Sequence, residues 1–214
     1  MQQKKPGLFI TLEGLDGVGK TTHINFIQDY IQSKGFKTYL TREPGGTEIG
    51  ESIRNLLLFN HEKINKITEL FLMFASRQEL ISNVIIPKLN EFFIVISDRF
   101  IDSSYAYQCG GRQIDTQHID SLISMLDGYL TPDLTILFDA DINIIFERIN
   151  KSTKKDRIEN ENLEFFNRIK SVYSELQKKN SQRIKIISTE KNIEVTQSKI
   201  IEIIDDLLIR KNLV

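Results

Sequence analysis

Gly14-Leu15-Asp16-Gly17-Val18-Gly19-Lys20-Thr21 is the stretch that decides the fold. It matches the pattern Gly-x-x-x-x-Gly-Lys-Ser/Thr, in which successive backbone N–H groups turn inward around phosphate oxygens. An apolar run, Gly7–Glu13, precedes it, and an amphipathic stretch, Lys20–Lys34, follows it. We therefore expect a buried strand, a phosphate-binding loop and a helix N-terminus, whose dipole also attracts phosphate. The alternative is a tight strand-to-helix turn that binds nothing.

Within this loop, Lys20 is expected to supply a cation to the β- and γ-phosphates of a nucleotide, and Thr21 a hydroxyl ligand for Mg²⁺. Mg²⁺ is the expected cofactor, with a nucleoside triphosphate as co-substrate. The motif alone does not separate GTPases, motors, small-molecule kinases and regulatory NTP binders. The predicted ATP-binding residues are Gly14, Leu15, Asp16, Gly17, Val18, Gly19, Lys20, Thr21 and Thr22.

Strand-like and helix-like patterns alternate along the whole chain. The expected strands are Gly7–Glu13, Phe36–Thr41, Phe93–Ser97, Asp133–Asp139 and Arg183–Ser188. The expected helices are Lys20–Lys34, Glu48–Leu58, Ile67–Leu89, about 115–126, Ile142–Ile149, Glu159–Lys179 and Ile193–Arg210. The stretch after the third strand is polar and contains glycine, and no structure is predicted for its first part. Such alternation predicts an α/β fold, a five-stranded parallel sheet flanked by helices on both faces.

The length of 214 residues fits one domain, 1–214, without a repeat or a linker. One charged interruption, Asn150–Arg157, is either a mobile lid, at about 149–158, or a solvated helix turn. The net charge of −1 gives no reason to expect a nucleic-acid polymer or an anionic membrane as partner. A single cysteine, Cys109, cannot form an internal disulfide, and no signal or membrane-spanning segment is expected. A cytoplasmic location is therefore expected.

Polar residues follow the third expected strand in the order Ser97-Asp98-Arg99-Phe100. Ligands of open α/β sheets bind at the carboxyl ends of the strands, so Asp98 and Arg99 should face the same crevice as the loop. Asp98 is expected to hold Mg²⁺, directly or through water, and Arg99 to grip a second phosphate bidentately. The alternative is an aspartate cap beside a solvated arginine. Further arginines, Arg42, Arg54 and Arg77, favour a small phosphorylated acceptor, which motors and GTPases do not need.

At this point the sequence resembles the thymidylate kinases, in their bacterial subgroup, along essentially the whole chain. The resemblance implies a nucleoside-monophosphate-kinase-like P-loop fold with a short lid. The implied reaction is ATP + dTMP → ADP + dTDP, which supplies dTTP for DNA synthesis, and the family usually forms homodimers. The motifs that carry the resemblance are Phe9–Thr22, Thr41–Gly46 (TREPGG), Ile53-Arg54, Phe71–Arg77, Ser97–Phe100, Ser103–Arg112, Pro132–Leu134 and Asp156–Glu159 (DRIE) with Phe165-Phe166.

The resemblance also assigns roles in binding dTMP. Asp16 matches the position that accepts from the deoxyribose 3′-hydroxyl, and Arg99 the residue that grips the dTMP phosphate. Arg77 matches the reader of thymine O4, and its N–H donors are mismatched to the cytosine amino group. Tyr107 matches the residue that crowds the ribose 2′ position, although Tyr105 and Tyr107 are alternatively ordinary core aromatics. The complete predicted set is Asp16, Arg42 and Glu43 (near the phosphate and magnesium), Arg54, Leu58, Met73, Phe74, Arg77, Arg99, Ser103, Ser104, Tyr107 and Gln108 (at the base edge, with Ser104).

Two parts of the sequence depart from the family pattern. Met73 stands where a phenylalanine usually stacks on the base, so either Met73 or the neighbouring Phe74 contacts the base. The usual lid arginine falls near Ser152, and the lid offers Lys151, Lys154 and Lys155 instead. The predicted catalytic residues are Lys20, Asp98, Arg99, Arg148 and Arg157, and the predicted metal ligands are Thr21 and Asp98. The competing interpretations are a kinase of another nucleotide or nucleoside and a non-catalytic NTP-dependent switch.

Overall fold

A computed structural model describes residues 7–60, 63–151 and 155–214 of the chain. Five parallel strands form one sheet in the order β2-β3-β1-β4-β5. Each strand lies within two residues of its predicted ends, which confirms the parallel α/β prediction. The strands are β1 (Leu8–Glu13), β2 (Thr38–Arg42), β3 (Ile94–Asp98), β4 (Leu134–Asp139) and β5 (Ile184–Ser188).

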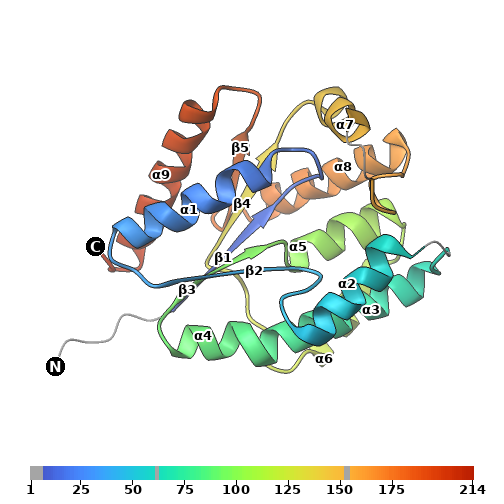
Figure 1. The fold of residues 1–214 in the computed structure, drawn as a ribbon, viewed down its shortest axis with the longest axis horizontal. Helices are drawn as coiled ribbons and strands as arrows, with labels where there is room; N and C mark the ends of the chain where they lie inside the picture. Colours follow the sequence, from blue (N-terminus) through green and yellow to red (C-terminus); the bar gives the residue numbers. More distant parts are fainter. Residues whose placement is uncertain (1–6, 61–62, 152–154) are drawn as a thin grey trace.

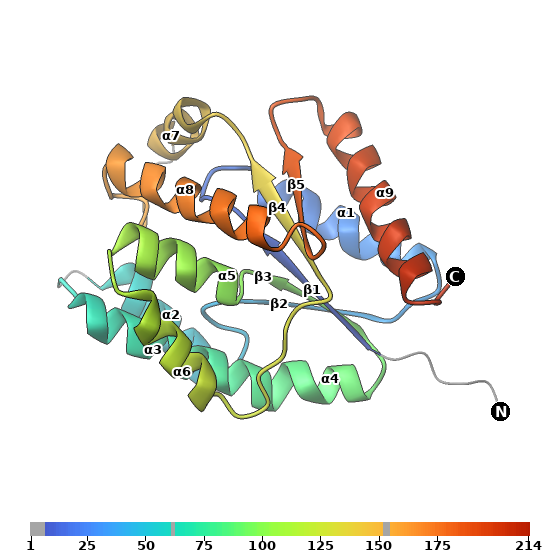
Figure 2. The same cartoon turned by 180° about the vertical axis from the view of Figure 1, so that it is seen from behind.

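Helices cover both faces of this sheet (Figures 1 and 2). Figure 1 shows α1 in front of the strands with α9 beside it, and the reverse view in Figure 2 brings α5 and α8 to the front. The α-helices are α1 (Lys20–Ser33), α2 (Glu48–Phe59), α3 (Lys66–Leu80), α4 (Ile86–Asn90), α5 (Ile101–Ser104), α6 (Thr116–Met125), α7 (Ile142–Lys151), α8 (Leu163–Lys179) and α9 (Ile193–Arg210). Two π-helical turns are η1 (Ile81–Ile85) and η2 (Tyr105–Gly111).

The central strand shows how the core is divided between the two faces. Leu8, Ile10 and Leu12 of β1 belong to the larger apolar cluster, whereas Phe9 packs with Val95 in a second cluster. Alternate residues of a strand point to opposite faces, so a strand buried on both sides must be apolar throughout. Two polar residues of β1 depart from this pattern and are fully buried: Thr11, whose hydroxyl lies 2.7 Å from that of Thr135, and Glu13, the last residue of the strand.

The predicted helix Ile67–Leu89 is one continuous helical path, but it contains a π-helical turn. α3, η1 and α4 follow one another from Lys66 to Asn90. Pro87 has no N–H to donate to the carbonyl of Asn83, and the wider turn lies directly before it.

The polar stretch after β3 is helical, which the sequence analysis did not predict. α5 and η2 run from Ile101 to Gly111, although two glycines make this segment a poor helix former. Packing against α8 explains it. A Cβ on Gly111 would lie 2.5 Å from the ring of Phe165, and one on Gly110 would lie 3.0 Å from the carbonyl oxygen of Arg168. The glycines therefore allow two helices to approach closely, and this tertiary packing outweighs local propensity.

The start of α8 also differs from its prediction. The helix begins at Leu163 and not at Glu159, because the side chain of Asn162 caps it by accepting from the N–H of Phe165. Before it, Asp156 accepts from the N–H groups of Ile158 and Glu159 and forms a separate turn. Among the described residues, no helix has the length and apolar character needed to cross a membrane.

Candidate active site

The glycine-rich loop lies between β1 and α1, as predicted. Gly14, Gly17 and Gly19 all have positive φ angles, of 135°, 74° and 102°. A side chain is strained in this region, and a Cβ on Gly14 would lie 2.4 Å from the carbonyl oxygen of Phe138. The Lys20 Nζ is buried and donates to the carbonyl oxygens of Gly14 and Leu15, at 3.1 and 3.2 Å. Burial, together with the charge of Arg99, lowers the pKa of Lys20.

Arg148 contacts the same loop from a neighbouring helix. It projects from α7, and its Nη1 lies 3.4 Å from the carbonyl oxygens of both Gly17 and Val18. Arg148, predicted as a catalytic residue, thus contacts the backbone of the glycine-rich loop, and its catalytic role stays a prediction. Thr22 is exposed on the first turn of α1.

Thr21 and Asp98 line one cavity beside the loop, together with Arg42 and Arg54. Asp98 Oδ1 is buried and has no hydrogen-bond partner within the described part of the chain, so it is available to bind a ligand there. Among the described residues, no group of three or more His, Cys, Asp or Glu side chains forms a metal site of its own. The pair therefore suits Mg²⁺ held jointly by protein and nucleotide phosphates, because Mg²⁺ typically takes one or two protein ligands and completes its shell with phosphates and water.

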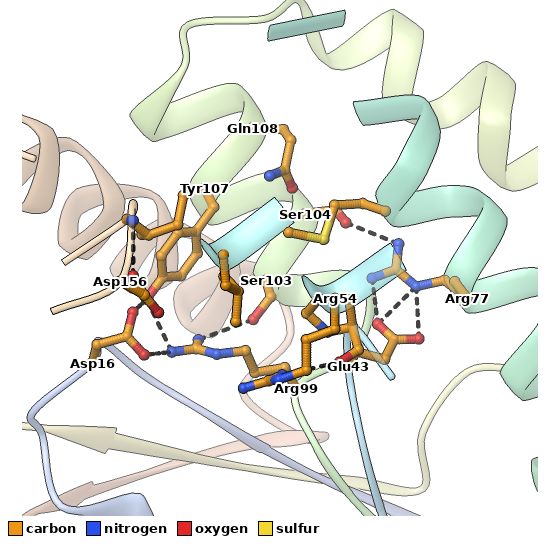
Figure 3. Close-up of a pocket in the computed structure, with 14 residues that line it drawn as sticks. Asp16, Glu43, Arg54, Arg77, Arg99, Ser103, Ser104, Tyr107, Gln108 and Asp156 are labelled. Carbon is orange, nitrogen blue, oxygen red and sulfur yellow. Dashed lines mark hydrogen bonds and ion pairs between the residues drawn. The ribbon is translucent and has the colours of Figure 1, made fainter. Parts of the chain in front are cut away.

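A second cavity, which we call the acceptor cavity, opens next to the loop. Figure 3 shows Asp16, Arg99 and Tyr107 at one end of it and Arg77 and Glu43 at the other. Most of the predicted dTMP-binding residues line it. The lining residues are Asp16, Glu43, Pro44, Arg54, Leu58, Met73, Arg77, Arg99, Ser103, Ser104, Tyr107, Gln108, Asp156 and Ile158.

Arg99 is held by a dense set of contacts at the loop end of the acceptor cavity. Its Nη2 donates to Asp16 Oδ1 at 2.6 Å and to the Tyr107 hydroxyl at 3.0 Å. Its Nη1 donates to the Gly14 carbonyl oxygen at 2.8 Å, and its guanidinium stacks on the Tyr107 ring, 4.8 Å from the centroid. The backbone of Arg99 has a φ of 74°, an uncommon value for a residue with a side chain.

Asp16 links the loop to the acceptor cavity. Burial acts to raise its pKa, but the charges of Arg99 and Lys20 and a hydrogen bond from Tyr107 outweigh this and lower the pKa to about 2. Asp16 is thus an anion at neutral pH, able to accept from a hydroxyl group.

Tyr107 lines the cavity, whereas Tyr105 donates to Asp120 away from it, so the core interpretation fits Tyr105.

Arg77 and Glu43 form a buried ion pair at the far end of the acceptor cavity. Arg77 Nε lies 3.0 and 3.1 Å from the two carboxylate oxygens of Glu43, and its Nη2 lies 2.5 Å from Oε2. Arg77 Nη1 donates to Ser104 Oγ at 2.8 Å. Only 2% of Arg77 and 5% of Glu43 is exposed. The Glu43 side chain therefore fixes the arginine predicted to read the base, while its backbone N–H donates to the carbonyl oxygen of Asp98 at 2.9 Å, and its predicted place near the phosphate and metal stays a prediction.

The helix face of α3 decides between the two candidates for contact with the base. Met73 lines the acceptor cavity, four residues before Arg77 and on the same face. Phe74 does not. It belongs to the second core cluster, and the guanidinium of Arg77 lies 4.9 Å from its ring centroid. The prediction that Phe74 binds dTMP is corrected accordingly, because the Phe74 ring lies in the core and packs against the guanidinium of Arg77.

Two further arginines lie away from the acceptor cavity. Arg42 is exposed and pairs with Glu51, so it faces the cavity of Thr21 and Asp98. Arg157 pairs with the buried Glu69 and donates to the Leu57 carbonyl oxygen, pointing away from the loop. The catalytic role predicted for Arg157 does not fit this position, since the buried carboxylate holds its guanidinium. The predicted lid residues Ser152 and Lys154 lie outside the described residues.

Five other residues belong to the site or its support. Pro44, Asp156 and Ile158 line the acceptor cavity, and Glu13 and Tyr173 lie beneath Arg99. The sequence carried a signal for Glu13, an acidic residue that ends an apolar strand at the ligand-binding edge. It carried none for Tyr173, which lies on an ordinary amphipathic helix and reaches the site only through packing.

If Arg77 reads thymine as the sequence predicts, substituting Glu43 with glutamine is expected to loosen Arg77 and to lower kcat/KM for dTMP by about 10- to 100-fold, since a charge-assisted hydrogen bond contributes about 1.5–3 kcal/mol. Steady-state kinetics with dTMP and dCMP measure this. The KM for ATP should stay within about twofold, because Glu43 lies at the far end of the acceptor cavity. An unchanged preference for dTMP over dCMP would contradict the role assigned to the pair.

Comparisons with known proteins give one family for most of the chain. The family model described as thymidylate kinase matches residues 12–200. A curated thymidylate kinase of Thiobacillus denitrificans is 42% identical over 202 residues, covering 94% of this chain and 98% of that protein. One from Ruthia magnifica is 45% identical over 195 residues, covering 91% and 95%. The crystal structure of thymidylate kinase from Ehrlichia chaffeensis has a TM-score of 0.77 and 35% identity, covering 94% of this chain and 100% of that one.

Proposed function

Because the chain belongs to the thymidylate kinase family and is thus a nucleoside monophosphate kinase, we propose that it transfers the γ-phosphoryl group of ATP to dTMP, giving ADP and dTDP. The observation that carries the proposal is the position of Arg99. Its guanidinium lies in the acceptor cavity and contacts both Asp16 and the Gly14 carbonyl oxygen of the phosphate-binding loop. One cation thus lies where a donor phosphate and an acceptor phosphate would meet.

The residues of the cavity suit phosphoryl transfer to an acceptor that is already a phosphate. Such an oxygen is anionic at neutral pH and needs no general base, so alignment and charge stabilisation supply most of the catalysis. Arg99 would hold the acceptor phosphate, and Lys20 and Arg148 would contact the donor phosphates from the loop side. Thr21 and Asp98 would hold Mg²⁺, which neutralises charge on the phosphates when bound. A nucleoside kinase would instead need a base to activate a hydroxyl.

The base end of the acceptor cavity supports thymine as the base. Arg77 lines this end and is held by Glu43, Ser104 and the Phe100 carbonyl oxygen, which leaves one N–H of its Nη1 as a donor for the base. Met73 offers an apolar surface on the same helix face. Donors suit the O4 of thymine and oppose the 4-amino group of cytosine. Tyr107 and Asp16 would contact the deoxyribose, and Gln108 the base edge.

The experiment that tests this proposal is product formation. Purified protein with ATP, Mg²⁺ and dTMP should give dTDP and ADP in equal amounts, followed by ³¹P NMR or by separation of the nucleotides. Chelation of Mg²⁺ should stop the reaction. Nucleotide binding without any dTDP would instead favour the non-catalytic alternative.

The proposal includes a homodimer and a role in dTTP supply in the cytoplasm. Large apolar side chains are exposed on α2 and α3, which pack against each other: Leu56, Phe59 and Phe71 are 50%, 62% and 57% exposed. Clustered exposed apolar residues are typical of interaction surfaces.

Phe71→Asp is expected to convert the dimer to a monomer in analytical ultracentrifugation. Ile209→Asp, at an exposed apolar residue of α9, should leave the mass unchanged, and an unchanged mass for both variants would contradict this interface.

A further inference from the structure

Glu13 is a fully buried acid whose two oxygens are both occupied by hydrogen bonds. Oε1 accepts from the backbone N–H of Phe100 at 2.8 Å. Oε2 accepts from the hydroxyls of Ser103 and Tyr173, at 2.6 and 2.8 Å. Glu13 does not line the acceptor cavity, so it is not placed to touch a substrate. Its partners, however, all lie next to Arg99.

The same two hydroxyls also accept from Arg99. Its Nη1 lies 3.2 Å from Ser103 Oγ and 3.4 Å from the Tyr173 hydroxyl. A hydroxyl has one hydrogen, and if it donates that hydrogen to a carboxylate, its lone pairs remain for the guanidinium. The two hydroxyl oxygens are also 2.9 Å from each other, but a charged carboxylate is the stronger acceptor for both hydrogens. The charge of Glu13 therefore holds both hydroxyl hydrogens on its own side and leaves the oxygen lone pairs to accept from Arg99.

Glu13 also helps to fix the backbone of Arg99. The N–H of Arg99 donates to the carbonyl oxygen of Leu12 at 2.9 Å, and the next N–H, of Phe100, donates to Glu13. Two successive amides are thus held by two successive residues of β1. This support matters because Arg99 has a positive φ, which a side-chain-bearing residue keeps only when its surroundings fix it.

We propose that Glu13 is a positioning residue for Arg99: its carboxylate orients the Ser103 and Tyr173 hydroxyls and the Phe100 amide so that the guanidinium is held ready for the acceptor phosphate. The inference rests on the proposed function, in which Arg99 binds the phosphate of dTMP. It adds a residue that acts on the acceptor side without contact with either nucleotide.

Glu13→Gln is the sharpest test, because it keeps the shape of the side chain and removes its charge. An amide can still accept from Phe100, but its nitrogen donates where the carboxylate accepted. The two hydroxyl hydrogens must then turn away from residue 13, and the amide takes up oxygen lone pairs that had accepted from Arg99. At pH 8 we expect kcat/KM for dTMP to fall about 30-fold, mainly through KM for dTMP, with KM for ATP within about twofold. The rise in melting temperature caused by dTMP should shrink, and that caused by ATP should not.

The pH dependence separates this role from a merely structural one. Burial, reinforced by the charge of Asp102, raises the pKa of Glu13 to about 7, while Arg99, Ser103 and Tyr173 oppose the rise. When Glu13 is protonated, its O–H group donates a hydrogen bond, as the amide N–H of the glutamine variant does. The ratio of wild-type to Glu13→Gln kcat/KM should therefore be large at pH 8 and approach one near pH 6, because kcat/KM reports the ionisations of the free enzyme. The ionisation of the dTMP phosphate cancels in this ratio.

Asp102→Asn is the matched control. Asp102 is equally buried and adjacent to Ser103, but its carboxylate is held by Arg183 and Thr135 and does not contact Arg99. This variant is expected to lose thermal stability and to keep a KM for dTMP within about threefold of wild type. In the pH profile of kcat/KM for dTMP, Asp102→Asn should also move the inflection to a lower pH than in the wild type, since the charge of Asp102 contributes to the raised pKa of Glu13.

The outcomes distinguish the inference from the proposed function. A wild-type protein that neither phosphorylates dTMP nor is stabilised by it overturns the proposed function. An active wild type with unchanged KM for dTMP and an unchanged pH profile in Glu13→Gln overturns the inference. If Glu13→Gln does not fold, Tyr173→Phe decides, because it removes one of the two oriented hydroxyls and leaves the carboxylate. It should raise KM for dTMP about fivefold, and no change would overturn the inference.

Discussion

Arg99→Ala is expected to lower kcat/KM for dTMP by about three orders of magnitude, the largest effect of any single substitution in the acceptor cavity. Arg99 is the charged donor that lies between the phosphate-binding loop and the acceptor cavity, with contacts to Asp16, Gly14 and Tyr107. Removing it would leave the acceptor phosphate without its bidentate partner and Asp16 without its counter-charge. Steady-state kinetics with dTMP as the varied substrate measure the loss.

A matched variant separates the geometry of Arg99 from its charge. Arg99→Lys keeps a cation but loses the planar fork that binds two oxygens together, so we expect a loss of about 10–100-fold. ATP binding, followed by calorimetry, should survive in both variants. Near-normal turnover of dTMP by Arg99→Ala would mean that the acceptor phosphate binds elsewhere.

Lys20→Met is expected to lower kcat by about three orders of magnitude and to weaken ATP binding, because the lysine of this loop stabilises charge on the transferring phosphoryl group. In the structure the ammonium is buried against the carbonyl oxygens of Gly14 and Leu15, at the mouth of the loop. Single-turnover experiments with ATP in excess measure the chemical step apart from binding.

The control for Lys20 is another lysine next to the same helix. Lys34 caps the C-terminal end of α1 and forms a partly exposed ion pair with Asp205. Exposed ion pairs contribute little to stability, so Lys34→Met should change stability slightly and kcat not at all. Equal losses in both variants would point to a general effect on α1, and unimpaired kcat in Lys20→Met would contradict the role of the loop.

The fold was predictable because its local signals agree with its tertiary structure. The helix Ile193–Arg210 begins and ends as predicted, since Asn192 caps an amphipathic pattern that faces the core. Each buried strand was visible as an apolar run. The segment Ile101–Gly111 was missed because its helix depends on contacts with Phe165 and Arg168, which lie about 55 residues further along the chain.

The site was predictable where residue type and strand end determine position. Lys20, Asp98 and Arg99 lie at the carboxyl edge of the sheet because a parallel α/β fold places its ligand there. Helical spacing favoured Met73 as the neighbour of the base. The ion pairs of Glu43 with Arg77 and of Arg157 with Glu69 were not predicted, because spacing along the chain does not reveal these buried partners. The role of Glu13 needed the direction of two hydroxyls, which only a structure supplies.

The most direct test of the central claim is ADP release with ATP and Mg²⁺ against a panel of dTMP, dUMP, dCMP, dGMP, AMP, UMP and thymidine. We predict strong turnover of dTMP, weaker turnover of dUMP, which lacks one methyl group worth about 0.8 kcal/mol, and negligible turnover of the others. The failure of thymidine would reflect the need for a phosphate on Arg99, and the failure of dCMP the donors of Arg77. Turnover of thymidine or dCMP that equals or exceeds that of dTMP would contradict the account.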